Sequence, residues 1–214
     1  MRLNKHIDDV ATAQIKEVVK KCSQYFEEVG TIGHLYRGTN TFNPPVEIKT
    51  PRENRVPKDT EMFVHHTLDD LMYKKFGWRP RSSGVFATAR PDIAWGYGQM
   101  TTIFVPTNGY KYLYATLGKY DDMADVFTQQ RFQPEYWYNR GPDDMPYREA
   151  EKQAYEEIVP AAEIYMSFLS DTQLVRPIKS GQITEIMFKC DRYYLIDRQL
   201  GDPLHKAIEE HYGK

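Results

Sequence analysis

One stretch of the sequence decides the expected fold: SGVFATARPDIAWGYG, residues 83–98. Its apolar run, Val85 to Ala89, contains a β-branched and an aromatic residue and therefore predicts a short buried strand. Pro91 interrupts this run, because proline has no N–H to donate to a central ladder. Asp92 is then placed to cap a short helix that reaches Trp95 and Tyr97. By itself, the stretch predicts a strand–turn–helix corner.

The composition limits what kind of protein this is. A length of 214 residues predicts one domain, and a net charge of −2 indicates no strong global field for nucleic acid or an anionic membrane. Cys22 and Cys190 stand far apart without CxxC spacing, which argues against a disulfide scaffold or a zinc site and suits a reducing compartment. Because no signal peptide or spanning run is evident, we expect a cytoplasmic protein without metal or membrane association.

The predicted organisation is a single domain over 1–214 with an N-terminal helix and an insertion. Residues 8–29 repeat apolar side chains at steps of mostly four, which is typical of an amphipathic helix, and Gly30 is placed to end it. The insertion is expected over 119–176, and its first part, 119–144, is acidic and aromatic. Further helices are predicted over 60–76, 146–159 and 203–212.

Two β-hairpins are predicted on either side of the insertion. Thr101 to Pro106 and Tyr110 to Tyr114 flank an Asn-Gly bend, which is a strong turn signal. Ile183 to Cys190 and Tyr193 to Asp197 flank a second short bend. The sequence therefore predicts that each strand pairs with its neighbour along the chain.

Glu185 is unusual for its place in a strand. Alternation puts Ile183, Glu185 and Met187 on one face, and the other face is also apolar, which is typical of a strand buried on both sides. A carboxylate there is costly unless it is paired or faces a cleft. Two interpretations stay open: a core ion pair with an arginine, or a carboxylate directed at a ligand.

Three islands of the sequence together resemble the ADP-ribosyltransferase superfamily. The second motif of the poly(ADP-ribose) polymerase-like branch is matched by Gly84, Val85, Phe86, Ala87, Thr88, Ala94 and Tyr97. LYRGT, residues 35–39, is similar to the first-strand motif, and ITEIMF, residues 183–188, resembles the late strand that carries the family's glutamate. The resemblance implies an α+β fold: a split, mostly antiparallel β-sandwich with surrounding helices.

The resemblance also implies a reaction. The substrate would be NAD, without a metal, and the activity would be mono-ADP-ribosyl transfer to a macromolecular acceptor, a protein or a nucleic acid, with release of nicotinamide. Glu185 would be the catalytic residue, because a carboxylate can accept a hydrogen bond from the ribose 2′-hydroxyl and stabilise an oxocarbenium-like state.

The same resemblance assigns the residues that would bind NAD. Tyr97 matches the aromatic position that stacks on nicotinamide, and Phe86 stands where the family often has a second tyrosine. Gly38 matches the glycine whose backbone holds the carboxamide. Arg37 is suited to forking onto the phosphate or ribose. The remaining motif positions are Thr39 and Thr88.

The chain also departs from the family patterns. The arginine-first branch usually carries Ser-Thr-Ser on its second motif, and here only Thr88 of 87–89 matches. That branch often has Gln or Glu two residues before the catalytic glutamate, where this chain has Ile183, so the acceptor need not be arginine. Two alternatives therefore remain: an NAD glycohydrolase, and a non-catalytic module that binds a protein or nucleic acid through the tyrosine-rich insertion.

Overall fold

The chain folds into a mixed α+β structure with two antiparallel sheets. The computed structural model describes residues 2–56, 60–116, 127, 129–142, 145–181 and 185–213. It divides into two compact units. The first unit comprises residues 1–51, 85–114 and 171–214, and the second comprises residues 52–84 and 115–170.

The two sheets have different strand orders. The first sheet has the order β1-β4-β8-β2, with bounds β1 Leu35–Thr39, β4 Met100–Pro106, β8 Tyr193–Asp197 and β2 Val46–Lys49. In the second sheet, β7 lies between β3 and β5, with bounds β3 Val85–Ala87, β7 Ile186–Lys189 and β5 Lys111–Ala115. Both sheets contribute to one hydrophobic core. The rings of Phe104 on β4 and Phe188 on β7 are 5.1 Å apart at their centroids.

Both predicted hairpins are wrong. β4 and β5 belong to different sheets, and so do β7 and β8. The sequence predicts both bends correctly. The strands on either side are apolar on both faces, however, so each strand can pair with a buried neighbour in either sheet. The two crossings contact each other: the Thr107 N–H donates to the Arg192 carbonyl at 3.0 Å, and the Arg192 N–H donates to the Thr107 hydroxyl at 3.3 Å. The chain thus changes sheet twice at one place.

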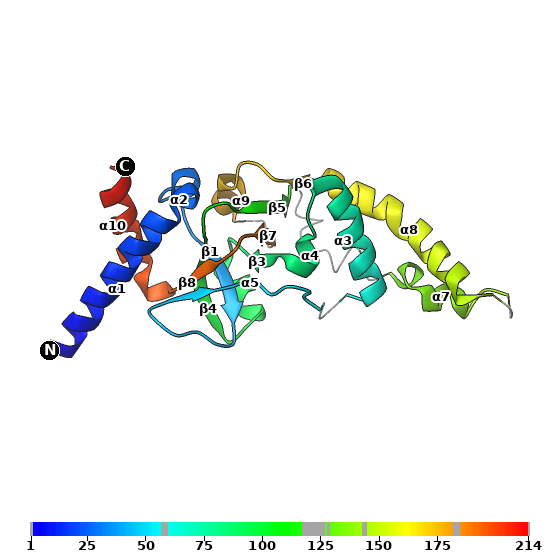
Figure 1. The fold of residues 1–214 in the computed structure, drawn as a ribbon, viewed down its shortest axis with the longest axis horizontal. Coiled ribbons are helices and arrows are strands. Elements are labelled where there is room, and N and C mark those ends of the chain that lie inside the picture. Colours follow the sequence, from blue (N-terminus) through cyan, green and yellow to red (C-terminus); the bar gives the residue numbers. More distant parts are fainter. Residues whose placement is uncertain are drawn as a thin grey trace. The chain divides into compact units, whose positions relative to one another are not determined.

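The helices of the first unit form around these sheets. They are α1 Arg2–Lys21, α2 Ser23–Val29, α5 Pro91–Gly96, α9 Val175–Ser180 and α10 Gly201–Tyr212. The helix predicted over 8–29 is interrupted at Cys22, and Val10 from its predicted apolar face is 43% exposed. α1 and α10 lie side by side (Figure 1), joined by an ion pair of 2.9 Å between Lys16 and Glu210.

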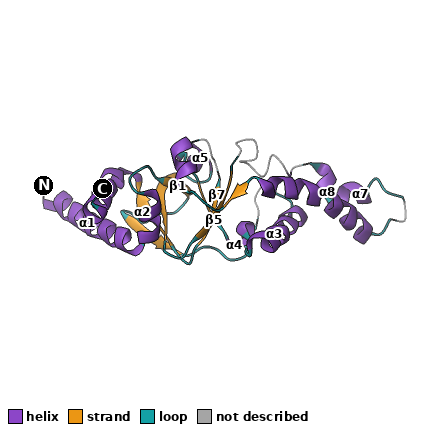
Figure 2. Cartoon of the chain, turned by 90° about the horizontal axis from the view of Figure 1, so that it is seen from above, coloured by secondary structure: helices purple, strands orange, loops and turns teal. Residues whose placement is uncertain are grey.

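The second unit is mainly helical. Its elements are α3 Met62–Phe76, α4 Pro80–Ser83, the 3-10 helix Gln130–Phe132, α7 Pro134–Tyr138, α8 Tyr147–Ser167 and the short strand β6 Leu169–Ser170. α3 ends at Gly77 in the left-handed region, as the sequence predicts. α7 lies beside α8 (Figure 2), and α8 continues through Pro160. The described residues of the predicted insertion up to residue 170 are grouped with residues 52–84. Residues 119–126, 128, 143 and 144 of the predicted insertion lie outside the described residues.

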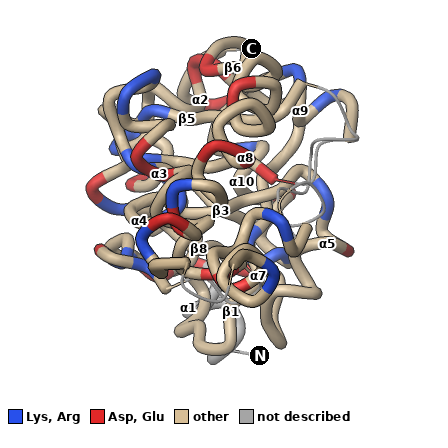
Figure 3. The backbone as a smooth tube through the Cα atoms, turned by 90° about the vertical axis from the view of Figure 1, so that its right-hand side faces the viewer, with Lys and Arg blue, Asp and Glu red and all other residues tan. Residues whose placement is uncertain are grey.

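Charges of both signs are interspersed along the chain (Figure 3), in keeping with the net charge of −2. Within the described part of the chain, no helix has the length and apolar character needed to cross a membrane.

Candidate functional site

The candidate site begins where β1 meets the end of β3. The Tyr36 N–H donates to the Thr88 carbonyl at 2.7 Å, and the Thr88 N–H donates to the Tyr36 carbonyl at 2.9 Å. This reciprocal pair forms an isolated antiparallel bridge just beyond β3. Two of the three sequence islands that resemble the family motifs are therefore joined directly through their backbones.

Arg37 strengthens the same junction. Its Nη1 donates to the Phe86 carbonyl oxygen at 2.5 Å, and its guanidinium carbon lies 5.7 Å from the centre of the Tyr193 ring. The Thr102 hydroxyl donates to the Arg37 carbonyl at 3.1 Å. The half-buried Arg37 side chain thus has a partner within the protein, which the prediction of a phosphate-binding arginine did not include.

Gly38 allows β1 to approach the end of α5 backbone to backbone. A Cβ at Gly38 would collide with the Ala94 carbonyl oxygen, and it would lie 2.9 Å from the Tyr97 carbonyl carbon. A Cβ at Gly98 would meet the Thr39 backbone, with Cα at 2.7 Å. Only glycine fits such a contact on both sides. This contact joins the first motif to the far end of the second.

The other predicted NAD-binding side chains differ in exposure. Thr88 is buried, and its hydroxyl accepts from the Arg90 N–H at 3.0 Å, so it shapes the turn into α5. Thr39 turns its hydroxyl onto the Thr41 carbonyl at 2.7 Å. Phe86 is half-buried on β3, opposite Met187. Tyr97 is 63% exposed at the end of α5, so its ring is accessible for stacking.

Glu185 is the first described residue of the third island. It precedes β7, whose first residue, Ile186, pairs with Ala87 in an antiparallel register. Extending that register by one residue places Glu185 opposite Thr88, the residue that is bridged to Tyr36. Glu185 is half-buried, and its Oε1 atom is buried. Ile183 and Thr184, which complete the predicted motif, lie outside the described residues.

The thiol near this site is in its neutral form. Burial raises the pKa of Cys190 to about 12, with Asp191 acting in the same direction and Arg37 opposing it. Burial likewise raises the pKa of Cys22 to about 12. Because the thiolate is the nucleophilic form, neither cysteine supplies a nucleophile at neutral pH.

The sequence prediction missed the residues that support the site. Gly98 could have been suspected from the Gly-Tyr-Gly pattern at 96–98, since closely spaced glycines often mark a near backbone approach. Thr102 and Tyr193 carry no such signal, because both lie in ordinary apolar strands and contact Arg37 only through the tertiary fold.

Two further results concern the identity of the site. Among the residues that the structure describes, no three His, Cys, Asp or Glu side chains are grouped so as to hold a metal ion. Comparisons with family models, curated proteins and solved structures found no match to this chain.

Proposed function

We propose that the protein transfers a single ADP-ribosyl group from NAD to a macromolecular acceptor and releases nicotinamide. The observation that carries the proposal is the junction of the three motif islands within the first unit. β1 and β3 are bridged at Tyr36 and Thr88, and β3 pairs with β7 next to Glu185. A chance resemblance of three short segments gives no reason for them to be neighbours in the fold.

The proposed fold assignment has the same basis. The first unit has two antiparallel sheets with a common core and helices around them, and we propose that this is the split β-sandwich of the ADP-ribosyltransferase superfamily. The order of the three motif strands along the chain agrees with that assignment.

The proposed chemistry is a substitution at the ribose anomeric carbon. The bond from C1′ to the nicotinamide nitrogen breaks, and its electron pair leaves with nicotinamide. A nucleophilic atom of the acceptor forms the new bond to C1′ and loses its proton. Glu185 would accept a hydrogen bond from the 2′-hydroxyl and stabilise the positive charge that develops on the sugar. A preorganised carboxylate is suited to this role because it needs no reorganisation as the charge develops.

The remaining residues would bind and orient NAD. Tyr97, exposed at the end of α5, would stack on the nicotinamide ring, with Phe86 as a wall that lacks a hydroxyl. The backbone of Gly38 would hold the carboxamide. Arg37 would keep its bond to the Phe86 carbonyl and direct its positive charge at a phosphate or ribose oxygen. Thr39 and Thr88 would stabilise the turns that carry these NAD-binding residues.

The test is incubation of the full chain with NAD labelled in the adenosine part, in the presence of cell extract. Nicotinamide release is measured by chromatography, and the label is followed into protein and nucleic-acid fractions. The proposal predicts both nicotinamide release and a label on a macromolecule. Free ADP-ribose with no labelled macromolecule would make the protein an NAD glycohydrolase. The absence of nicotinamide release would leave the non-catalytic module as the better assignment.

A further inference from the structure

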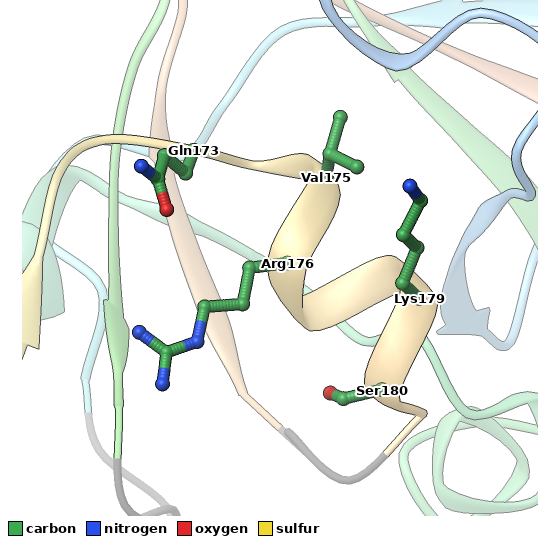
Figure 4. A pocket seen from close by; sticks show the side chains of 5 residues that line it. All are labelled: Gln173, Val175, Arg176, Lys179 and Ser180. Carbon is green, nitrogen blue, oxygen red and sulfur yellow. The ribbon is translucent and has the colours of Figure 1, made fainter.

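A second candidate site lies at α9 in the first unit, apart from the residues assigned to NAD. A cavity of about 620 Å³ is lined by Gln173, Val175, Arg176, Lys179 and Ser180 (Figure 4). Sites for small ligands or single nucleotides typically occupy about 300–1,000 Å³. The cavity is a depression largely open to solvent, its volume falls within this range, and two of the five lining residues carry positive charge.

These positive charges are not neutralised within the described part of the chain. Arg176 and Lys179 are both exposed, and neither forms an ion pair with a described carboxylate. The carboxylate of Glu28 is already occupied: it accepts from the Tyr110 hydroxyl at 2.7 Å and from the Tyr112 hydroxyl at 2.7 Å. Two cations at one cavity that form no ion pair with a described carboxylate favour an anionic ligand.

The backbone around the cavity is held in place by buried contacts. The Leu174 N–H approaches both the Glu28 carboxylate, at 3.1 Å, and the Tyr112 hydroxyl, at 3.0 Å, and Leu174 itself is fully buried. Gln173, at the edge of the cavity, has a φ of 59°, in the left-handed region that residues other than glycine rarely adopt. Such strained positions often occur at ligand sites. The backbone at the Gln173 edge of the cavity is therefore fixed by these contacts.

We propose that this cavity is a site for phosphate esters and that the phosphates belong to a single-stranded nucleic acid. In Figure 4 the Arg176 guanidinium lies on the side of Gln173, whereas the Lys179 ammonium points toward Val175. Two cations that point in different directions suit successive phosphates of a strand better than one shared phosphate. Arginine supplies planar, paired donors for a phosphate, and Val175 offers an apolar surface beside them.

The test measures binding of a fluorescent 12-nucleotide single strand to the full chain by anisotropy, without NAD, so its outcome is independent of the proposed transfer. At 50 mM salt we expect a dissociation constant below about 100 µM. The double substitution Arg176→Gln and Lys179→Gln should weaken binding at least about tenfold. It should also make the slope of log K against log salt shallower by about 1.4, since each single-strand phosphate contact contributes about 0.7.

The matched control is Arg192→Gln, which removes an exposed arginine of the same unit that does not line the cavity. It should change the affinity less than twofold. Equal losses in the control and the double variant, or no binding by the wild type, would overturn the proposal. If AMP or inorganic phosphate competes as well as an unlabelled strand at equal phosphate concentration, the cavity is a site for a small phosphorylated molecule. That result would overturn the assignment to a strand.

Discussion

The two compact units contain two carboxylates in contrasting surroundings. Asp69 in the second unit is 1% exposed and accepts from the Arg81 N–H at 2.9 Å, the Ser82 N–H at 2.8 Å and the Ser82 hydroxyl. Its donors all come from the nearby helix α4. Glu185 in the first unit is half-buried beside a strand junction formed by segments far apart in the sequence. A carboxylate saturated by local donors stabilises the fold, whereas we propose that one placed by long-range strand pairing serves a ligand.

The largest stability effect is expected at the glycine contact that brings β1 to α5. In Gly38→Ala, the new Cβ collides with the Ala94 carbonyl oxygen, and both partners are backbone. We expect a loss of about 3 kcal/mol or more in unfolding free energy, because overpacking that the backbone cannot relieve is costly. Denaturant unfolding measures this loss.

The control for this substitution is Gly96→Ala in α5, the helix that Gly38 approaches. A Cβ at Gly96 meets nothing within 4 Å, and alanine is the better helix former. Its stability should be unchanged or slightly higher. If Gly38→Ala were as stable as Gly96→Ala, the close approach of β1 and α5 would be contradicted.

Asp69→Asn is expected to lower stability and leave catalysis intact. The amide has only one acceptor oxygen, so a buried N–H or hydroxyl donor on Arg81 or Ser82 loses its partner, which costs about 2–3 kcal/mol. Nicotinamide release per folded molecule should stay at the wild-type value. A large fall in that rate, with stability preserved, would mean that the second unit takes part in the reaction.

A smaller effect is expected from pH, through one histidine in each unit. Burial lowers the pKa of His65 to about 4, with Asp69 opposing the shift, and burial together with His205 lowers the pKa of His34 to about 4. The unfolded chain, with a histidine pKa of 6.5, therefore binds more protons between pH 4 and 6.5 than the folded chain. The contribution of each neutral histidine to the unfolding free energy is therefore present in full above pH 6.5 and is lost as the pH falls toward 4. This contribution is at most about 1.4 kcal/mol for each unit by which the folded and unfolded pKa values differ.

Single substitutions separate the two histidines. His65→Gln and His34→Gln each remove one titrating group, so each should flatten the pH dependence of unfolding free energy by up to about 2 kcal/mol between pH 7 and pH 4.5. Urea unfolding at both pH values measures the difference. An unchanged slope in either variant would show that the histidine in that unit is not buried in its neutral form.

Local signals made part of the fold predictable from the sequence. Pro91 and the apolar run before it define the corner of β3 and α5, although Pro91 itself occupies the first turn and Asp92 pairs with Arg90 at 2.5 Å instead of capping the helix. Gly77 ends α3 as its position predicted. In these cases the determining residues lie within a few positions of the structure that they determine.

Strand pairing was not predictable in the same way. β4 and β5 are joined by an Asn-Gly bend but lie in different sheets, because a bend reverses the chain without selecting its partner. The contact of Arg37 with the Phe86 carbonyl and the approach of Gly38 to Ala94 depend on that pairing. The candidate site could therefore be assembled from the sequence only through motif resemblance, and its supporting contacts required the structure.

The most direct test of the central claim compares Glu185→Gln with Asp69→Asn in two measurements, the rate of nicotinamide release per folded molecule and the melting temperature. Glutamine keeps the shape of Glu185 and removes its charge, so we predict a fall in rate of about a hundred- to a thousand-fold with little change in melting temperature. Asp69→Asn should show the reverse pattern. If Glu185→Gln instead melts much earlier and keeps the full rate per folded molecule, Glu185 is a structural residue and the assignment of an ADP-ribosyltransferase site is contradicted.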